Sequence, residues 1–177
     1  CLIMGIVNTT PDSFSDGGKY NSASKAIDFA YNLLNEGADI IDIGGESSRP
    51  GANPVSAEEE IRRISPVLNE LSKNTNSTIS IDTYKSSTAS YAIDAGAYLV
   101  NDISGLTFDR EMVNIVSKYN VPIVIMHMRG TPKTMQKNTN YVNVIDEICD
   151  FLNNQVNLAI DKNISSDKII VDPGIGF

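Results

Sequence analysis

The sequence is poor in the residues that build disulfide frameworks and metal centres. Among its 177 residues are two cysteines, Cys1 and Cys149, and a single histidine, His127. Two cysteines do not make the disulfide framework of a small secreted domain, and their spacing from the histidine is not that of a metal site. We therefore expect both thiols to be inert.

Positive charge and long apolar runs are also scarce. The 14 Lys and Arg residues are outnumbered by 22 Asp and Glu residues, so the formal net charge is -8. A negatively charged protein is not attracted to phosphate backbones or anionic lipid. No apolar run approaches the roughly 20 residues of a membrane helix, and the N-terminus does not have the residue order of a signal peptide. These absences predict a cytoplasmic protein that binds neither nucleic acid nor membranes.

Strand-like and helix-like segments alternate along the chain, whose hydrophobic content of 41% suits one domain over residues 1–177,. The strand-like segments are rich in Ile and Val without polar alternation, which is typical of parallel strands buried on both faces. They are Leu2–Val7, Asp39–Ile43, Thr78–Ile81, Ala97–Val100, Val121–Met126 and Lys168–Val171. Helical periodicity covers Ala23–Glu36, Ala57–Lys73, Ser86–Asp94, Arg110–Lys118 and Tyr141–Asp161. Ser56 with Glu59 predicts a capping box, and Gly37 and Gly96 mark helix ends,.

This alternation indicates an α/β fold, and the length of the repeat favours a barrel. Units of about 30 residues extrapolate to roughly 240 residues for eight units, close to the ~250 of a TIM-type (β/α)8 barrel. We therefore expect an incomplete barrel, truncated at the C-terminus, with the first six strands and five helices. A doubly wound open sheet is the alternative. Against it, the first strand is followed by Asn8-Thr-Thr-Pro-Asp and not by a G-x-G-x-x-G turn,.

Polar residues close the predicted strands. They are Asn8, Asp42, Asp82, Asn101 with Asp102, His127 and Asp172. In a parallel barrel the C-terminal ends of all strands meet at one face, where active sites lie. A helix cap or turn explains any one such residue but not a set in register. Asp82 and Asp172 indicate function most strongly, because a carboxylate that ends a buried strand needs a compensating partner. Asp42 and His127 are interpreted as supporting residues.

Two of the loops that follow these strands have unusual compositions. The loop after the first strand is polar and Gly-rich yet contains Phe14, which is typical of a mobile lid with an aromatic plug,. The loop after the second strand, residues 44–52, combines backbone N–H groups, hydroxyls and Arg49. Such a set can hold an anionic group such as a phosphate.

The motifs resemble those of the dihydropteroate synthase family along essentially the whole chain. They are MGIVNTTPDSFSDGG from Met4, DIGGESSRPG from Asp42, SIDT from Ser80, VNDISG from Val100, MHMRGTPKTMQ from Met126 and VDPGIGF from Val171. The first two are long enough to be highly specific. The resemblance implies folate biosynthesis: a dihydropterin methyl diphosphate condenses with p-aminobenzoate to give dihydropteroate and diphosphate. It also implies a target of sulfonamides and, at full length, a homodimer.

Residue roles follow from the same resemblance. Asn8 would bind Mg²⁺, and Asp16 and Arg49 would act in the two loops that close over the substrates. The substrate-binding residues would be Phe14, Ser48, Pro50, Asp82, Asn101, Met126, Asp172 and Phe177. The family also uses a Lys near its seventh strand and an Arg-x-His motif after its eighth, and neither occurs in these 177 residues. We therefore expect the fragment alone to be inactive.

Two other functions are compatible with a polar rim of this kind. A pterin-dependent corrinoid methyltransferase shares the barrel but should lack the Ser-Phe-Ser-Asp-Gly-Gly and Ser-Ser-Arg-Pro loops. A non-catalytic pterin- or folate-binding protein would use the rim without a reaction.

Overall fold

The fold consists of six strands and five α-helices that alternate along the chain. The computed structural model describes residues 1–10, 18–47, 49, 51–137 and 139–176. The strands are β1 (Met4–Asn8), β2 (Ile40–Gly44), β3 (Thr78–Asp82), β4 (Leu99–Asp102), β5 (Ile123–Met126) and β6 (Ile169–Asp172). The helices are α1 (Gly18–Asn35), α2 (Ala57–Asn74), α3 (Ser86–Asp94), α4 (Met112–Tyr119) and α5 (Val144–Asp161), and a 3-10 turn, Ser166–Lys168, precedes β6.

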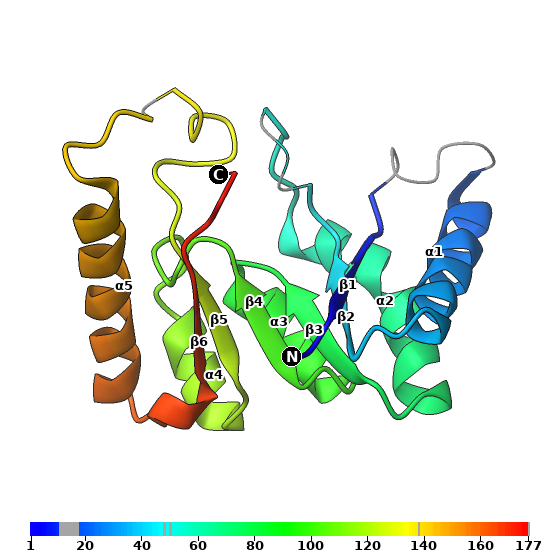
Figure 1. The fold of residues 1–177 in the computed structure, drawn as a ribbon. Coiled ribbons are helices and arrows are strands. Elements are labelled where there is room, and N and C mark those ends of the chain that lie inside the picture. The colour runs from blue at the N-terminus through cyan, green and yellow to red at the C-terminus, as the bar shows by residue number, and fades with distance from the viewer. Residues whose placement is uncertain (11–17, 48, 50, 138, 177) are drawn as a thin grey trace.

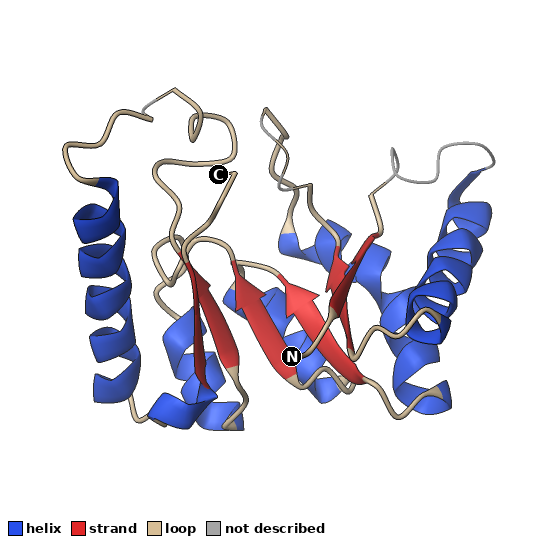
Figure 2. Ribbon diagram, viewed as in Figure 1, coloured by secondary structure: helices blue, strands red, loops and turns tan. Residues whose placement is uncertain are grey.

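The strands form one curved sheet in which their spatial order equals their sequence order. Each described strand pairs in parallel with the next, from β1 to β6. The helices lie along the outside of the curve, and the loops that follow the strands all lie at one end (Figures 1 and 2). A doubly wound sheet reverses its strand order at a switch point and carries helices on both faces. That alternative is therefore wrong, and the sequential α/β-barrel arrangement is confirmed.

The core fills the layer between the sheet and its helices. Ile41, Ile43 and Ile81 point to this side and are 0% exposed, as are Ile64 and Leu68 of α2. They belong to one cluster of buried apolar side chains. Because successive strand residues face opposite sides, the intervening positions line the inner face of the sheet. The sequence of each strand thus separates a packing side from a side available for chemistry.

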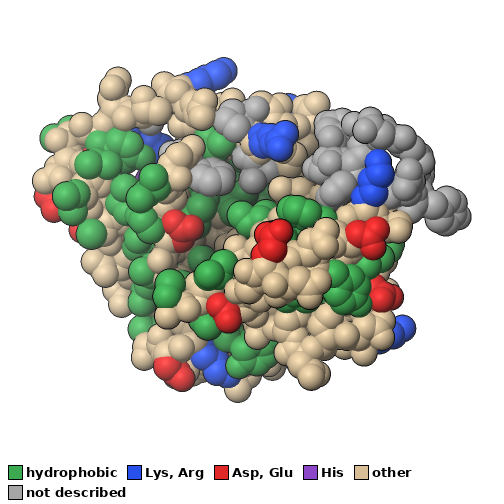
Figure 3. Space-filling view, turned by 45° about the vertical axis from the view of Figure 1, so that its right-hand side comes forward, with side chains coloured by type: hydrophobic (Ala, Val, Ile, Leu, Met, Phe, Trp, Pro, Cys, Tyr) green, Lys and Arg blue, Asp and Glu red, His purple; other side chains and the backbone are tan. Residues whose placement is uncertain are grey.

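The two edge strands are less buried than the sequence predicted. Ile6 of β1 is 59% exposed, and Ile170 and Val171 of β6 are 49% and 50% exposed. The expectation of burial on both faces is therefore wrong for β1 and β6, although it holds for the central strands. An edge strand has a neighbour on one side only, so its side chains are covered from fewer directions. Apolar side chains are visible among charged ones at the surface (Figure 3).

Local signals at the helix ends were mostly predicted correctly. The Ser56 side chain accepts a hydrogen bond from the Glu59 amide at 3.2 Å, and Gly37 and Gly96 have φ of +103° and +112°. The second half of the capping box is absent: the Glu59 carboxylate instead pairs with Arg62 and Arg63. α5 begins at Val144 rather than Tyr141, because the Asn143 side chain caps its first turn by accepting from the Asp146 amide,. No helix in the described part of the chain combines the length and apolarity needed to cross a membrane.

Candidate functional site

Four of the polar residues predicted to close the strands lie in the last paired position of a strand pair: Asn8, Asp82, Asn101 and Asp172. Asn8 pairs with Gly44, Gly44 with Asp82, and Asp82 with Asn101. Paired residues of neighbouring strands point to the same face. Since Ile43 and Ile81 face the helices, these residues face the inner side of the sheet, at the end where the loops gather (Figure 2). The sequence-based prediction of a polar rim at this end therefore agrees with the structure.

Gly44 separates two side chains of the rim. A methyl group at this position would lie 3.3 Å from Asn8 Oδ1 and 3.3 Å from Asp82 Oδ2. Both oxygens thus face the space that the missing side chain leaves. A side chain here would make close contact with both oxygens, whereas the backbone conformation of Gly44 is an ordinary one,.

Asp82 lies in a negatively charged environment. Burial, followed by the charges of Asp42, Glu60, Asp102 and Glu46, raises the pKa of Asp82 well above its ordinary value. A carboxyl group with such a pKa holds its proton more readily and gains most from a ligand that brings hydrogen-bond donors.

Asp42 and Asn101 form a hydrogen bond across the strand between them. Asn101 Nδ2 donates to Asp42 Oδ2 at 2.9 Å. Asp42 is 2% exposed, and burial raises its pKa although hydrogen bonds with Ser80 and then with Asn101 work against the shift. Asp102 points to the other face and binds the backbone amides of Ser104 and Leu106. Asp102 is thus a turn residue and not a member of the rim, which corrects its grouping with Asn101.

Asp172 accepts two hydrogen bonds at the end of β6. Its Oδ1 accepts a hydrogen bond from the Gly174 amide at 2.8 Å, and its carbonyl accepts from the His127 amide at 2.9 Å. The prediction of a carboxylate in a fully buried strand is wrong, because β6 is an edge strand and Asp172 is half-buried. Met126, its partner in β5, is 3% exposed and packs with Ile103, Met128 and Met135.

His127 is packed between aromatic rings outside this rim. Its ring lies edge-on to Phe151 at 5.1 Å and is tilted relative to Tyr141 at 6.1 Å. Burial and then the charge of Arg129 lower the pKa of His127. This environment agrees with the supporting role expected for it.

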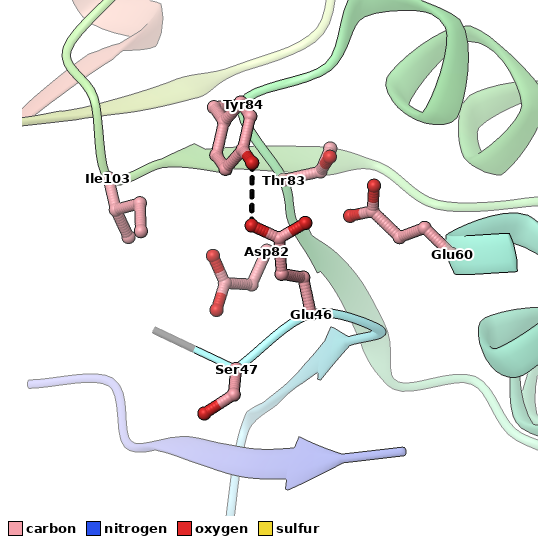
Figure 4. A pocket seen from close by; sticks show the side chains of 7 residues that line it. All are labelled: Glu46, Ser47, Glu60, Asp82, Thr83, Tyr84 and Ile103. Carbon is pink, nitrogen blue, oxygen red and sulfur yellow. Dashed lines mark hydrogen bonds between the residues drawn. The ribbon is translucent and has the colours of Figure 1, made fainter. Parts of the chain in front are cut away.

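A small hollow opens beside Asp82. It is lined by Glu46, Ser47, Glu60, Asp82, Thr83, Tyr84 and Ile103, and Figure 4 shows carboxylates from β3, from the loop after β2 and from α2 turned towards it. Three acidic side chains around one small space require compensation by positive charge or by donors.

Lys85 supplies that compensation in a network that the sequence reasoning missed. Its Nζ lies 2.7 Å from Glu46 Oε2 and 2.8 Å from Glu60 Oε2. The Tyr84 hydroxyl donates to Glu46, and the Thr88 hydroxyl donates to Glu60 at 3.1 Å. One signal in the sequence was available: Glu60 stands four residues before Ile64 on the apolar side of α2, where a charge needs a partner,.

Five predicted site residues lie outside the described part of the chain: Phe14, Asp16, Ser48, Pro50 and Phe177. The side chain of Arg49 is exposed, and its backbone amide donates to the Ser47 hydroxyl at 3.3 Å. The same loop contacts the loop after β5, since the Gly51 amide donates to the Pro132 carbonyl at 3.1 Å.

The sequential parallel sheet and its rim of amide and carboxyl groups define the class: an α/β-barrel protein with a polar site at the C-terminal ends of its strands. A sequence profile of the pterin binding enzymes matches residues 4–177. The chain belongs to this family, as the motifs predicted.

Individual relatives agree with this assignment. Dihydropteroate synthase of Synechocystis sp. is 49% identical over 175 residues, which are 99% of this chain and 61% of that protein. A Clostridium difficile dihydropteroate synthase, solved in the presence of pteroic acid, superposes with a TM-score of 0.92 at 42% identity and covers 99% of this chain and 65% of its own. The Xanthomonas albilineans dihydropteroate synthase with 4-aminobenzoic acid superposes with a TM-score of 0.91 at 40% identity. This match covers 99% of this chain and 62% of that one. The chain thus spans about three fifths of the length of these relatives.

Proposed function

We propose that this chain is the pterin-binding portion of a dihydropteroate synthase. The observation that carries the proposal is the row of Asp82, Asn101 and Asp172 along the strand ends of the sheet. The chain is 49% identical to such an enzyme over 175 residues. The whole protein would join a dihydropterin methyl diphosphate to p-aminobenzoate and release diphosphate. A corrinoid methyltransferase is less well supported, because the relatives described above are dihydropteroate synthases.

The rim has the hydrogen-bonding character that a pterin requires. A pterin ring presents an amidine-like edge of N–H donors, and a carboxylate accepts such donors in pairs. Asp172 uses one oxygen in its turn and keeps Oδ2 for a ligand. Asp82 adds an acceptor whose environment favours incoming donors, and Asn101 both donates and accepts. Buried Met126 provides an apolar surface next to Asp172.

The proposed reaction is a substitution at the pterin methylene group. The carbon–oxygen bond to diphosphate breaks, and the bonding electron pair leaves with diphosphate. The arylamine nitrogen attacks the resonance-stabilised cation that remains and then releases one proton to the departing diphosphate or to water. No protein nucleophile is needed, so the protein contributes orientation, charge stabilisation and exclusion of water. We assign closure over the substrates to the loops with Asp16 and Arg49, an anion-binding hydroxyl to Ser48, and the walls of the substrate pockets to Phe14, Pro50 and Phe177.

Asn8 is suited to hold Mg²⁺ together with a diphosphate. Mg²⁺ prefers hard oxygen ligands and keeps several waters, with one or two protein ligands and substrate phosphates completing its shell. Asn8 Oδ1 points into the space beside Gly44 and offers such an oxygen. When bound, the ion would neutralise charge on the leaving diphosphate.

The proposal is tested by assaying the whole protein and this chain separately. The whole protein should form dihydropteroate from the two substrates only when Mg²⁺ is present. This chain should bind 6-hydroxymethylpterin in a calorimetric titration, with an affinity that falls when Asp172 is replaced. Absence of both dihydropteroate formation and pterin binding would overturn the proposal. Homodimer formation by the whole protein and its cytoplasmic location stay predictions, which sedimentation and cell fractionation would test.

A further inference from the structure

The side-chain hydrogen bond between Asp42 and Asn101 assigns a function to a buried carboxylate that lies below the rim. We propose that Asp42 is a positioning residue: by accepting from Asn101 Nδ2, it fixes which way round the Asn101 amide faces the site. This inference rests on the proposed pterin site, and it adds a residue that does not itself contact the ligand.

Asp42 is placed where a carboxylate is unfavourable for folding. It is 2% exposed between Ile41 and Ile43. Ser80, its paired residue in β3, is 0% exposed, and the Ser80 hydroxyl and the Asn101 amide both offset part of the effect that burial has on the pKa of Asp42. Burying a carboxylate destabilises the native state relative to an apolar residue of similar shape. Packing alone would therefore favour an apolar side chain here.

One hydrogen bond of Asp42 is directed at a residue of the site. Asp42 in β2 and Asn101 in β4 lie on opposite sides of β3, and the 2.9 Å contact between Oδ2 and Nδ2 bridges that strand. Electrostatics determine the orientation of the amide. If it were reversed, its carbonyl oxygen would lie against a carboxylate oxygen, and two acceptors at this distance repel.

The fixed orientation determines what Asn101 offers to a ligand. One amide hydrogen is used by Asp42, so Oδ1 and the second hydrogen remain for the inner face,. Asp82 is the neighbour of Asn101 in the sheet and points to the same face. Without Asp42, the amide group would turn its hydrogens towards Asp82 and occupy the carboxyl group that the ligand needs. Asp42 thus keeps an amide acceptor next to a carboxyl acceptor, an arrangement selective for a ring edge with adjacent N–H donors.

The test uses this chain with Asp42→Leu and Asp42→Asn. Leucine has the same branching and the same number of side-chain heavy atoms as aspartate but accepts no hydrogen bond, whereas asparagine retains an acceptor oxygen. We expect Asp42→Leu to bind 6-hydroxymethylpterin about 10- to 100-fold more weakly, the range for losing a hydrogen bond to a charged group. Its melting temperature should be equal to or higher than that of the parent. Asp42→Asn should keep most of the affinity.

A double-mutant cycle shows whether Asp42 acts through Asn101. In an Asn101→Ala background the Asp42→Leu replacement should have no further effect on affinity, since the group that it positions is gone. Full additivity of the two losses would overturn the proposal.

A ligand-independent measurement separates this inference from the proposed function. In nitrogen-15 NMR spectra the Asn101 side-chain amide should exchange slowly with water in the parent and in Asp42→Asn, and rapidly in Asp42→Leu. Equal exchange in all three variants would refute the positioning role. If the chain binds no pterin yet shows this exchange pattern, the proposed function fails while the role of Asp42 stands.

Discussion

Replacing Lys85 by methionine tests whether the buried charge network holds the base of the site together. Lys85 Nζ is the cation shared by Glu46 and Glu60, at 2.7 Å and 2.8 Å. The side chains of Glu46 and Glu60 are 10% and 1% exposed, and that of Lys85 is 17% exposed. Methionine preserves most of the length and the apolar stem of lysine but removes the charge and the donors.

The expected loss of stability follows from what remains after the replacement. Glu46 keeps hydrogen bonds from Tyr84 and from the Val55 amide, and Glu60 keeps one from Thr88. None of these three donors is charged, so two carboxylates stay buried without a cation. Removing one partner of a buried ion pair costs about 3–5 kcal/mol, a large part of the 5–15 kcal/mol that stabilises a typical domain.

Urea unfolding of the chain at pH 7.5 measures this loss. Adding Glu60→Gln should restore part of the stability by removing one of the two charges.

Lys118→Met is the matched control. Lys118 is exposed and lies over the ring of Tyr119 at 5.1 Å, much as Lys85 lies over Tyr84 at 4.4 Å. It has no described carboxylate partner, and its loss should change stability by about 0.5 kcal/mol or less,. If Lys85→Met is no more destabilising than this control, or if adding Glu60→Gln restores no stability, the reasoning about the network is wrong.

Three further predictions concern the rim itself. Asp82→Asn should stabilise the chain at neutral pH while weakening pterin binding. Burial raises the pKa of Asp82 in the folded state above its unfolded value of about 3.9,. Wild-type Asp82 therefore destabilises the fold increasingly as the pH rises above about 4. Urea unfolding should show a gap that widens from pH 4 to pH 8, and a constant gap would contradict the assigned cause. Asp172→Ala should weaken pterin binding at least about tenfold and lower the free energy of unfolding by about 1 kcal/mol, because the turn hydrogen bond is lost,. If the losses of binding free energy and of unfolding free energy were equal, Asp172 would act only in the turn. Gly44→Ala should weaken pterin binding, because the new methyl group lies 3.3 Å from Asn8 Oδ1 and Asp82 Oδ2, and unchanged affinity in a titration would show that this space is not used.

Features that depend on residues close together in the sequence could be predicted. The apolar strand cores, the glycines at helix ends and the Ser56 cap are signals within a few residues of one another. Parallel strands bring their C-terminal ends together, so the sequence alone predicts that Asn8, Asp82 and Asn101 lie on one rim,. The exposure of Ile6 and Ile170 was not foreseen, because a strand pattern shows what can be buried but not how many neighbours the strand has.

The sequence by itself determined the alternation of strands and helices, the family and the chemical types of the rim residues, since each of these is written in short motifs. Only the tertiary structure decided which charges and amides meet. Lys85 is 39 residues from Glu46 and 25 from Glu60, and Asn101 is 59 residues from Asp42. Hydrogen bonds and ion pairs depend on distances of about 3 Å. Such distances between residues far apart in the chain are set by the packing of α2 on the sheet and by the register of β2, β3 and β4.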